Sequence, residues 1–540
     1  MALKILVVSA EAFPLAKTGG LGDAVSGLSQ SLLAQDAQVT LMLPAYRGTR
    51  EALRYVREVA VLTGMPGGDA VLLAGECPAL GLPVLLLKND ALYDRDGLYV
   101  DEDGNEYQDN AVRFAALAHA AARVARGLDS VPRPHIVHCH DWHAALVPLL
   151  LRQHQIDEVK TVLTLHNVAF QGWFPSTLAP SLGISESYCT GKGLDAHGCL
   201  NFLKAGISLA DLITVVSHNY AREILTPAFG CGLEDTLRAR VSDTMSIPNG
   251  IDSSLWNPQR DRYLAGRCFS ADELGNKAVC KRELQRRFGL AQDDRAVVMA
   301  MGSRLTTQKM ADVVVEAVPL ALEAHPALQV CIMGQGDKAL EKALSALEQA
   351  YPGRCSVHIG FDEAQAHLLH AGSDMLLHGS RFEPFGLTPI YAMRYGTLPI
   401  GSRLGGMADT IADPGADKPT AAMRAGSGIL FEGERPQDMA RAIDRAMSLH
   451  GQPDVWRAMR QNAMRADFDW SRSAPMYMRA YQLLRPDVAV DRIPERRRSV
   501  VPLRSWTPVR ADADRAGPRP GLAAGKMTRT LGSGSGAGVV

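Results

Sequence analysis

A lysine followed by closely spaced glycines is the first pattern in this chain that suggests chemistry. The stretch AKTGGLGDAV (residues 16–25) places Lys17 ahead of Gly19, Gly20 and Gly22. Glycine at this density is costly unless the backbone bends sharply or a ligand comes close to it. If the glycines begin a helix, its free N–H groups and its dipole suit an anion. The alternative is a tight strand-to-helix turn that carries a surface lysine.

The run HCHDWH (138–143) leaves two interpretations open. His138 and His140 would share one face of a strand, with Asp141 and His143 close behind, and such groups can bind a metal. Dinuclear hydrolases use a similar run, but their acid stands next to the final histidine, so the spacing here disfavours a metal site. The other interpretation is that these polar groups hydrogen-bond a hydroxyl-rich ligand.

The apolar run that follows the histidines also ends in polar residues. The stretch TVLTLHN places His166 and Asn167 at its end. Because ligands bind beyond the carboxyl ends of strands in such sheets, these side chains would project toward the same crevice as Asp141. A lone histidine is usually a satisfied core group, but two polar strand ends side by side favour a site.

Two cations follow an apolar run in the second half of the chain. The stretch GSRLTTQK places Arg304 and Lys309 directly after that run. Arginine offers a planar fork of donors and lysine a point charge, a combination that suits a diphosphate. The alternative is a pair of solvated surface cations.

A carboxylate stands in a similar position further on. The stretch SRFEPFGLTP (380–389) places Glu383 beside aromatic residues, ahead of a predicted helix that Gly386, Leu387 and Thr388 begin. This placement is unusual for solvation alone, and ribose hydroxyls or a sugar ring suit it as partners.

The elements that would carry these residues alternate between apolar runs and helical patterns. The runs KILVVSA (4–10) and QVTLMLPAY (38–46) predict strands on either side of a helical pattern, which is the βαβ signature of a parallel sheet. The alternation begins again at RAVVMAM (295–301), after turn signals in IPNGIDSSLWNP (247–258). We therefore predict two α/β domains in series.

Composition excludes several classes of protein. The 540 residues are too many for one hydrophobic core, and the formal net charge of −1 gives no reason to expect nucleic acid or a membrane surface as partner. No stretch reaches membrane length without charges. The nine cysteines form no CxxC pair, which favours reduced thiols and a cytoplasmic location. Residues 491–540, rich in Pro, Gly and Arg, predict a disordered tail.

Taken together, the motifs resemble a known family. The chain contains in order KTGGLGD, HCHDWH, LTLHNVAFQG, FLKAGISLADLITVVSHNYAREI, NGID, SRLTTQK and SRFEPFGLTPIYAMRYGTLPI, followed by GGMADTI. This series closely resembles the bacterial glycogen synthases, the ADP-glucose-dependent starch and glycogen synthase family. The resemblance implies a GT-B fold, in which two Rossmann-like, doubly wound parallel-sheet domains face each other across a deep cleft. It places the domains at 1–255 and 256–470, with a C-terminal helix over 471–490 that crosses back to the first domain.

The resemblance also implies an activity and a set of site residues. The activity is transfer of glucose from ADP-glucose to the non-reducing end of an α-1,4-glucan (glycogen or a malto-oligosaccharide), with retention at the anomeric carbon and without metal or other cofactor. By motif position, the catalytic residues would be Glu383, Lys309, Arg304, His166 and Asp141. The nucleotide sugar would contact Lys17, Gly19, Gly20, Asn249, Arg304, Lys309, Phe361, Glu383, Gly386, Leu387 and Thr388.

Three positions depart from the pattern of this family. Met310 replaces the usual glycine of SQKG, Phe385 replaces the cysteine of EPCG, and Phe361 is the aromatic residue at the tyrosine of IGY. These departures bear on acceptor range, kinetics and base preference more than on the class of reaction.

Three other functions stay open, each with an observation that decides it. A related GT-B enzyme would use UDP-glucose, which donor competition would reveal. A non-catalytic glucan-binding protein would have no reason to keep Lys17, Arg304, Lys309 and Glu383 together. A metallohydrolase built on the histidine run would lose its activity on chelation.

Overall fold

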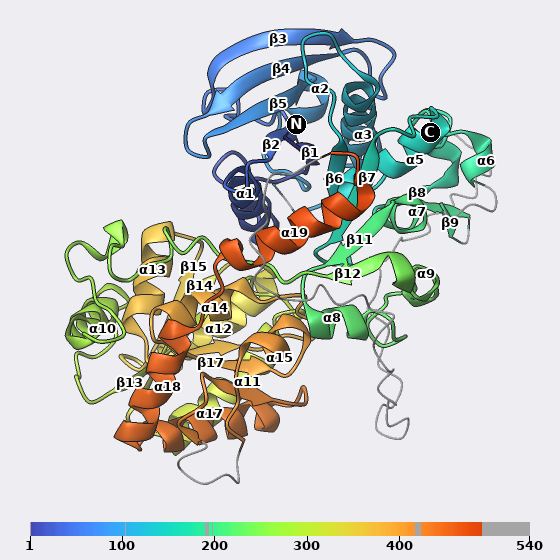
Figure 1. Cartoon of the computed structure of the whole chain (residues 1–540). Coiled ribbons are helices and arrows are strands. Elements are labelled where there is room, and N and C mark those ends of the chain that lie inside the picture. Colours follow the sequence, from blue (N-terminus) through green and yellow to red (C-terminus); the bar gives the residue numbers. More distant parts are fainter. Residues whose placement is uncertain (1, 103, 190–193, 197, 416–422, 489–540) are drawn as a thin grey trace, which may run out of the picture. The chain divides into compact units, whose positions relative to one another are not determined.

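The structure, a computed structural model, describes residues 2–102, 104–189, 194–196, 198–415 and 423–488. The tail predicted for 491–540 lies outside the described residues. Two α/β sheets dominate the fold, one built from the blue to green strands of Figure 1 and one from the yellow to orange strands.

The N-terminal sheet has the order β12-β11-β7-β6-β1-β2-β5-β4-β3 within the described part of the chain. Its central strands β1, β6 and β7 are buried along almost their whole length, as in a sheet that is covered on both faces. β4 runs antiparallel to β3 and β5, which gives the otherwise parallel sheet an antiparallel edge. The strands are β1 (Lys4–Val8), β2 (Gln38–Pro44), β3 (Arg54–Leu62), β4 (Ala70–Cys77), β5 (Leu82–Lys88), β6 (Ile136–His140), β7 (Lys160–Leu165), β11 (Leu212–Val215) and β12 (Thr244–Ser246).

Helices connect these strands, and a small antiparallel sheet with the order β8-β10-β9 follows β7. The helices are α1 (Gly20–Leu33), α2 (Asp90–Tyr93), α3 (Asn110–Arg126), α4 (Asp141–Ala144), α5 (Val147–Gln153), α6 (Glu186–Cys189), α7 (Phe202–Leu209), α8 (His218–Glu223) and α9 (Glu234–Ala239). The small strands are β8 (Trp173–Pro175), β9 (Asp195–Ala196) and β10 (Cys199–Asn201). Single 3-10 turns span Ser176–Leu178, Val241–Asp243 and Arg262–Leu264.

The C-terminal sheet is parallel throughout and has the order β15-β14-β13-β16-β17-β18. Numbered from its own first strand this is 3-2-1-4-5-6, the order of a Rossmann sheet. The strands are β13 (Val297–Gly302), β14 (Leu328–Gly334), β15 (Cys355–Ile359), β16 (Met375–His378), β17 (Leu398–Ser402) and β18 (Ile429–Phe431). The helices are α10 (Gly275–Arg287), α11 (Ala311–Ala324), α12 (Lys338–Ala350), α13 (Glu363–Gly372), α14 (Leu387–Arg394), α15 (Gly405–Thr410), α17 (Pro436–His450) and α18 (Pro453–Arg465).

The last described helix, α19 (Trp470–Leu484), packs against the first domain. Its buried residues Trp470, Tyr477, Met478 and Tyr481 belong to the same apolar core as the residues of α1 and β1. Figure 1 shows this orange-red helix beside α1. The chain therefore returns to its N-terminal half after the second sheet is complete.

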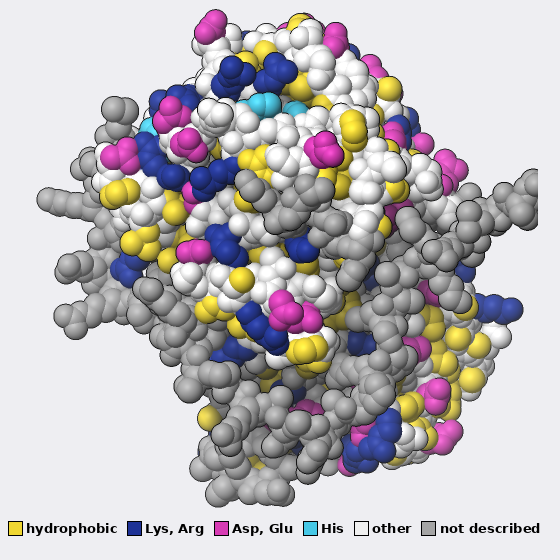
Figure 2. Space-filling model, turned by 90° about the vertical axis from the view of Figure 1, so that its right-hand side faces the viewer, with side chains coloured by type: hydrophobic (Ala, Val, Ile, Leu, Met, Phe, Trp, Pro, Cys, Tyr) yellow, Lys and Arg dark blue, Asp and Glu magenta, His cyan; other side chains and the backbone are white. Residues whose placement is uncertain are grey.

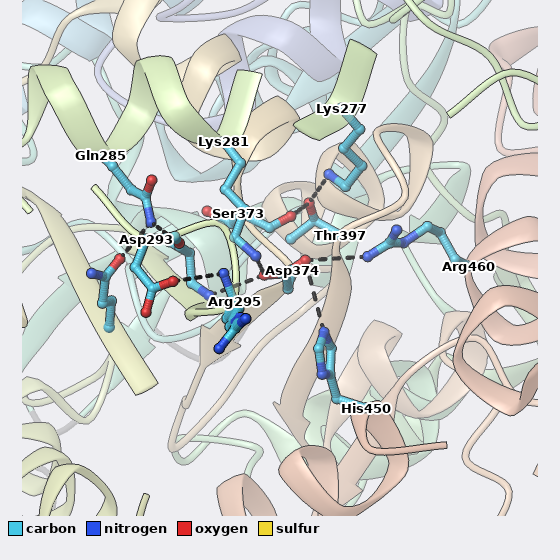
Figure 3. Close-up of polar contacts among 12 residues, drawn as sticks. Lys277, Lys281, Gln285, Asp293, Arg295, Ser373, Asp374, Thr397, His450 and Arg460 are labelled. Atoms are coloured by element: carbon cyan, nitrogen blue, oxygen red, sulfur yellow. Dashed lines mark hydrogen bonds and ion pairs between the residues drawn. The ribbon is translucent and has the colours of Figure 1, made fainter. Parts of the chain in front are cut away.

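A buried cluster of charged residues holds α10 and α18 against the C-terminal sheet. The cluster lies at the edge opposite the carboxyl ends of the strands. Asp374, which precedes β16, accepts hydrogen bonds from Lys281 Nζ at 2.7 Å and Arg460 at 3.3 Å (Figure 3). Lys277 of the same helix as Lys281 donates to the carbonyl of Ala371 at 3.0 Å and to the hydroxyl of Thr397 at 2.9 Å. These contacts join α10 and α18 to the sheet.

One face of the molecule carries charges of both signs (Figure 2). On the face that Figure 2 presents, Lys and Arg side chains lie interspersed with Asp and Glu side chains, without a large patch of one sign. Within the described residues no helix is both long and apolar enough to cross a membrane.

Candidate functional site

The C-terminal sheet reverses its strand order between β13 and β16, and ligands of doubly wound sheets bind beyond the strand ends at such a point. The loop after β13 carries Arg304 and Lys309, and the loop after β16 carries Glu383. These predicted site residues therefore lie on neighbouring strand ends, and Lys309 and Glu383 meet in an ion pair.

Glu383 is the centre of this group. Its Oε2 atom accepts a hydrogen bond from Lys309 Nζ and a second, of 3.0 Å, from His378 Nε2. Burial alone would raise the pKa of Glu383, but Lys309 and His378 outweigh it and hold the pKa well below its usual range. The carboxylate is therefore ionised and held at two points.

Sequence reasoning missed His378. This histidine is the last residue of β16 and is buried, so in the sequence it reads as the end of a core strand. Burial lowers its pKa, and a neutral ring that donates through Nε2 to Glu383 leaves Nδ1 as a buried acceptor without a partner. A polar residue at a strand end next to the switch point is the signal that identifies it.

The remaining predicted residues of this domain surround the ion pair. Arg304 is exposed and donates to Gln308 at 2.9 Å, so it does not contact Lys309 or Glu383 through a hydrogen bond. Gly386 precedes α14 with φ of 88°, a left-handed conformation that favours glycine, and Leu387 and Thr388 form the first turn. Phe361 follows β15 with 64% of its surface exposed.

The first domain has its own switch point between β1 and β6. After β1, Lys17 pairs with Asp23 at 2.9 Å and its Nζ lies 5.0 Å from the centre of the Phe13 ring. The N–H groups of Thr18 and Gly19 donate to Glu11 at 2.8 and 3.2 Å. The glycine-rich turn thus already holds one carboxylate, which the sequence analysis did not anticipate.

After β6, Asp141 lies buried at the start of α4 in a left-handed conformation with φ of 54°. Its Oδ1 atom accepts the backbone N–H groups of His166 at 2.7 Å and Asn167 at 3.3 Å. Burial raises the pKa of Asp141 to about 7. Asp141 therefore ties the ends of β6 and β7 together, as their adjacent positions in the sheet allow.

The histidine run takes part in hydrogen bonds and ring packing. His138 contacts the Thr164 hydroxyl at 2.6 Å, and His140 contacts His166 at 2.9 Å between ring nitrogens. His143 stacks on Tyr99 with ring centres 4.7 Å apart. Among the described residues there is no group of three or more His, Cys, Asp or Glu side chains arranged to hold a metal ion.

Several contacts join the two domains near these strand ends. Ser217 Oγ donates to the carbonyl of Pro384 at 2.6 Å, directly beside Glu383. Glu223 of α8 accepts the N–H of Gly405, the first residue of α15, at 2.9 Å. Asp409 of α15 in turn accepts the N–H of Asn219 in α8 at 2.8 Å. Each of the two helices therefore supplies a carboxylate to the N-terminus of the other.

The glycine loops of the two domains also approach each other. A methyl group at Gly20 would lie 3.0 Å from Leu387 Cδ1. Asn249 is buried in the connecting segment, and its Oδ1 atom has no partner among the described residues. A cavity of about 400 Å³ lies beside the Lys17–Asp23 pair, lined in part by Tyr391.

Comparisons with known proteins show which family this chain is similar to. Residues 4–239 match the family model of the starch synthase catalytic domain, and residues 281–465 match that of glycosyl transferases group 1. The chain is 57% identical over 477 residues to a glycogen synthase of Bordetella petrii, which covers 88% of this chain and 92% of that protein. This chain belongs to the glycogen synthase family. A glycogen synthase of Ralstonia nicotianae is 50% identical over 487 residues, covering 90% of this chain and 89% of the relative.

Solved structures agree with this membership. The catalytic domain of starch synthase IV from Arabidopsis thaliana, bound to ADP and acarbose, matches with a TM-score of 0.81 and 28% identity over 89% of this chain and 99% of that chain. Sucrose-phosphate synthase from Thermosynechococcus elongatus matches with a TM-score of 0.57 and 17% identity over 90% of this chain and 100% of that chain, which is a likeness of fold alone. The fold is GT-B, and the predicted family and fold class are confirmed. Membership in the glycogen synthase family favours a glycosyltransferase over the metallohydrolase and non-catalytic alternatives.

Proposed function

We propose that the chain transfers glucose from ADP-glucose to the non-reducing end of an α-1,4-glucan, with retention of configuration at the anomeric carbon. The observation that carries this proposal is the buried Lys309–Glu383 pair at the switch point of a chain that is 57% identical to a glycogen synthase. The structural relative bound to ADP and acarbose supports an adenine nucleotide and a glucan-like sugar as ligands.

The cations would bind the diphosphate of the donor. Departure of ADP leaves negative charge on the phosphates, and preorganised cations in a secluded site stabilise such charge strongly. Lys309 is largely buried, Arg304 is exposed beside it in the same loop, and Lys17 would contribute from the other domain. With these three cations around the leaving group, we propose that the reaction requires no metal ion.

The nucleoside would lie along the second domain. The exposed ring of Phe361 offers a flat apolar face on which a base can stack. The first turn of α14 follows Gly386 and begins with Leu387 and Thr388, and the free N–H groups of such a turn suit a phosphate or ribose oxygen.

The glucosyl group would lie between the two switch points. Glu383 is ionised and fixed by two donors, so it can accept a hydrogen bond from a sugar hydroxyl or stabilise positive charge on the ring. Asp141 and His166 would face the sugar from the first domain, and the unpartnered Oδ1 atom of Asn249 would accept a further hydrogen bond. Exclusion of water around the sugar would suppress hydrolysis of the donor.

We further propose that the protein acts in the cytoplasm on glycogen or malto-oligosaccharides, with neither nucleic acid nor a membrane as partner. All nine cysteines are free thiols in the structure, which fits a reducing compartment. The formal net charge of −1 and the mixed charges on the face that Figure 2 presents fit a neutral glucan rather than a polyanion.

Incorporation of radiolabelled glucose from ADP-glucose into glycogen tests this function directly. The assay compares ADP-glucose with UDP-glucose at equal concentration, each with and without EDTA, and the linkage of the product is determined by NMR. We expect α-1,4-linked product, preference for ADP-glucose, and no effect of EDTA. Preference for UDP-glucose would refute the proposed donor and indicate another GT-B activity. Loss of activity on chelation would refute the metal-free mechanism.

A further inference from the structure

A histidine outside the predicted set contacts one of the predicted site residues. His140 is the last residue of β6 and is fully buried. Its Nδ1 atom lies 2.9 Å from Nε2 of His166, at the end of the neighbouring strand β7. One of these two nitrogens must carry the proton that the other accepts.

The surroundings of His140 decide which nitrogen donates. Its second nitrogen, Nε2, is buried and has no hydrogen-bond partner among the described residues. Among buried backbone groups, an N–H without an acceptor is rarer than a C=O without a donor, and we apply the same preference to the ring nitrogens. The proton of His140 therefore resides on Nδ1, which donates to His166.

This assignment determines the state of His166. Burial lowers the pKa of His166 to about 3, so the ring is neutral near pH 7. Since Nε2 of His166 accepts from His140, its own proton must be on Nδ1. That atom makes no hydrogen bond to the described residues and is not among the buried atoms that lack a partner, so it remains accessible.

The ring of His140 is itself held in place. His138 lies beneath it with ring centres 4.3 Å apart. Nδ1 of His138 pairs with the hydroxyl of Tyr481 in α19 at 2.7 Å, and its Nε2 pairs with the hydroxyl of Thr164 at 2.6 Å. Both nitrogens of His138 are thus satisfied, and the plane on which His140 packs is fixed from two directions.

We infer that His140 is a positioning residue that fixes His166 as the Nδ1–H tautomer, so that His166 presents an N–H donor to an oxygen of the glucosyl group. This inference rests on the proposed function for the identity of the acceptor oxygen. The hydrogen bond between the two rings lies within the protein and does not depend on which ligand binds. The opposite tautomer would present a lone pair to the sugar and could not donate to it.

Two substitutions at position 140 separate the hydrogen bond from the packing. Asparagine carries its amide on the same Cγ atom that bears Nδ1 in histidine, so His140→Asn keeps a donor toward His166. His140→Leu fills a similar volume without a donor. We expect His140→Leu to lower kcat by about tenfold or more, as loss of an orienting hydrogen bond does in other sites, with KM for ADP-glucose little changed. His140→Asn should recover most of kcat.

A partly exposed histidine away from the site provides the control. His119 contacts the carbonyl of Leu182 at 2.8 Å and lies in α3 of the same domain. His119→Leu should lower the thermal midpoint but leave kcat unchanged. If His140→Asn and His140→Leu lower kcat equally, the role of His140 is packing and the inference is wrong.

The tautomer is measured independently of the reaction. The full-length protein, labelled with ¹⁵N-histidine, gives separate shifts for protonated and unprotonated ring nitrogens, and the His166 signals are identified by their absence in His166→Gln. We expect a protonated Nδ1 in the wild type and in His140→Asn, and mixed or inverted tautomers in His140→Leu. A protonated Nε2 in the wild type would overturn the inference. Failure of the wild type to transfer glucose would refute the proposed function and leave the tautomer result standing.

Discussion

Lys309 and Glu383 form an ion pair across the point where the C-terminal sheet reverses its strand order, although they lie 74 residues apart in the chain. Both side chains are largely buried, and a second donor, His378, holds the same carboxylate oxygen. The charge of Lys309 is therefore oriented before any ligand arrives. Preorganisation of this kind acts on the transition state because no further reorganisation is needed when charge develops.

Loss of either partner should affect kcat most. We expect Lys309→Ala and Glu383→Ala each to lower kcat by about two to three orders of magnitude, which corresponds to about 3 to 4 kcal/mol for one preorganised electrostatic group. KM for ADP-glucose should change less, because the negative charge on the leaving group is larger in the transition state than in bound ADP-glucose. Steady-state kinetics with glycogen as acceptor measure both constants.

A lysine of the same domain serves as the control. Lys338 pairs with Glu341 but its side chain is 87% exposed, so Lys338→Ala should leave kcat unchanged. A near-normal kcat in Lys309→Ala or Glu383→Ala would show that the pair is structural and that another group stabilises the leaving diphosphate.

The contact between α8 and α15 should make stability depend on pH. Burial, with a smaller contribution from nearby Asp409, raises the pKa of Glu223 to about 7 against the opposing effect of the hydrogen bonds from Gly405 and Asn219. A carboxyl group with a raised folded-state pKa stabilises the fold fully below its unfolded value of about 4.3, and this contribution is lost as pH rises toward 7.

Glu223→Gln tests this directly, because glutamine keeps an acceptor for the N–H of Gly405 and never ionises. We expect the stability of the variant relative to the wild type to increase between pH 5 and pH 7, by at most about 1.4 kcal/mol per pH unit. Thermal unfolding at a series of pH values gives the difference. Parallel curves for the two proteins would mean that Glu223 does not titrate in this range.

The buried cluster of Figure 3 should contribute to stability without contributing to chemistry. Burial would raise the pKa of Asp374, but Lys281 and Arg460 hold it below its ordinary value. Asp374→Asn leaves these two cations buried without their counter-charge, and breaking a buried pair in this way costs about 3 to 5 kcal/mol. We expect a lower thermal midpoint and an unchanged kcat at low temperature.

An exposed ion pair of the same domain provides the comparison. Asp294 pairs with Arg282 at 3.2 Å, and its side chain is 67% exposed. Asp294→Asn should change stability by no more than about 0.5 kcal/mol. Equal effects of the two substitutions would contradict the role given to the buried cluster.

The strands and the residues that follow them could be predicted from the sequence, because an apolar run and the polar residues at its end are local features. Arg304 and Lys309 follow β13, and Glu383 follows β16, as their runs indicate. The ion pair itself depends on strand order, which places β13 beside β16. No single-sequence pattern specifies that order, so only the resemblance to a family brought these residues together.

Residues that act through distant partners could not be found in this way. Glu11 interrupts an apolar run in the sequence, but in the structure it accepts a hydrogen bond from the hydroxyl of Tyr99, 88 residues away. His138 contacts Tyr481 over a separation of 343 residues. These side chains are polar groups inside the fold, and the tertiary structure determines their hydrogen-bond partners.

Met310 gives the last prediction, because two opposing effects meet at one residue. It precedes α11 with φ of 53°, a left-handed conformation that favours glycine, and it stands where the family usually has glycine. Its side chain is fully buried and packs against Gly379 and Ser402. Met310→Gly would relieve about 1 kcal/mol of backbone strain but remove a buried side chain worth about 2 to 5 kcal/mol. We therefore expect Met310→Gly to be less stable than the wild type.

Met310→Ala loses the same packing and keeps the strain, so it should be about 1 kcal/mol less stable than Met310→Gly, the reverse of the usual preference in helices. Thermal unfolding of the three proteins measures this order, and a Met310→Gly variant more stable than the wild type would show that the surrounding core closes over the space that methionine fills.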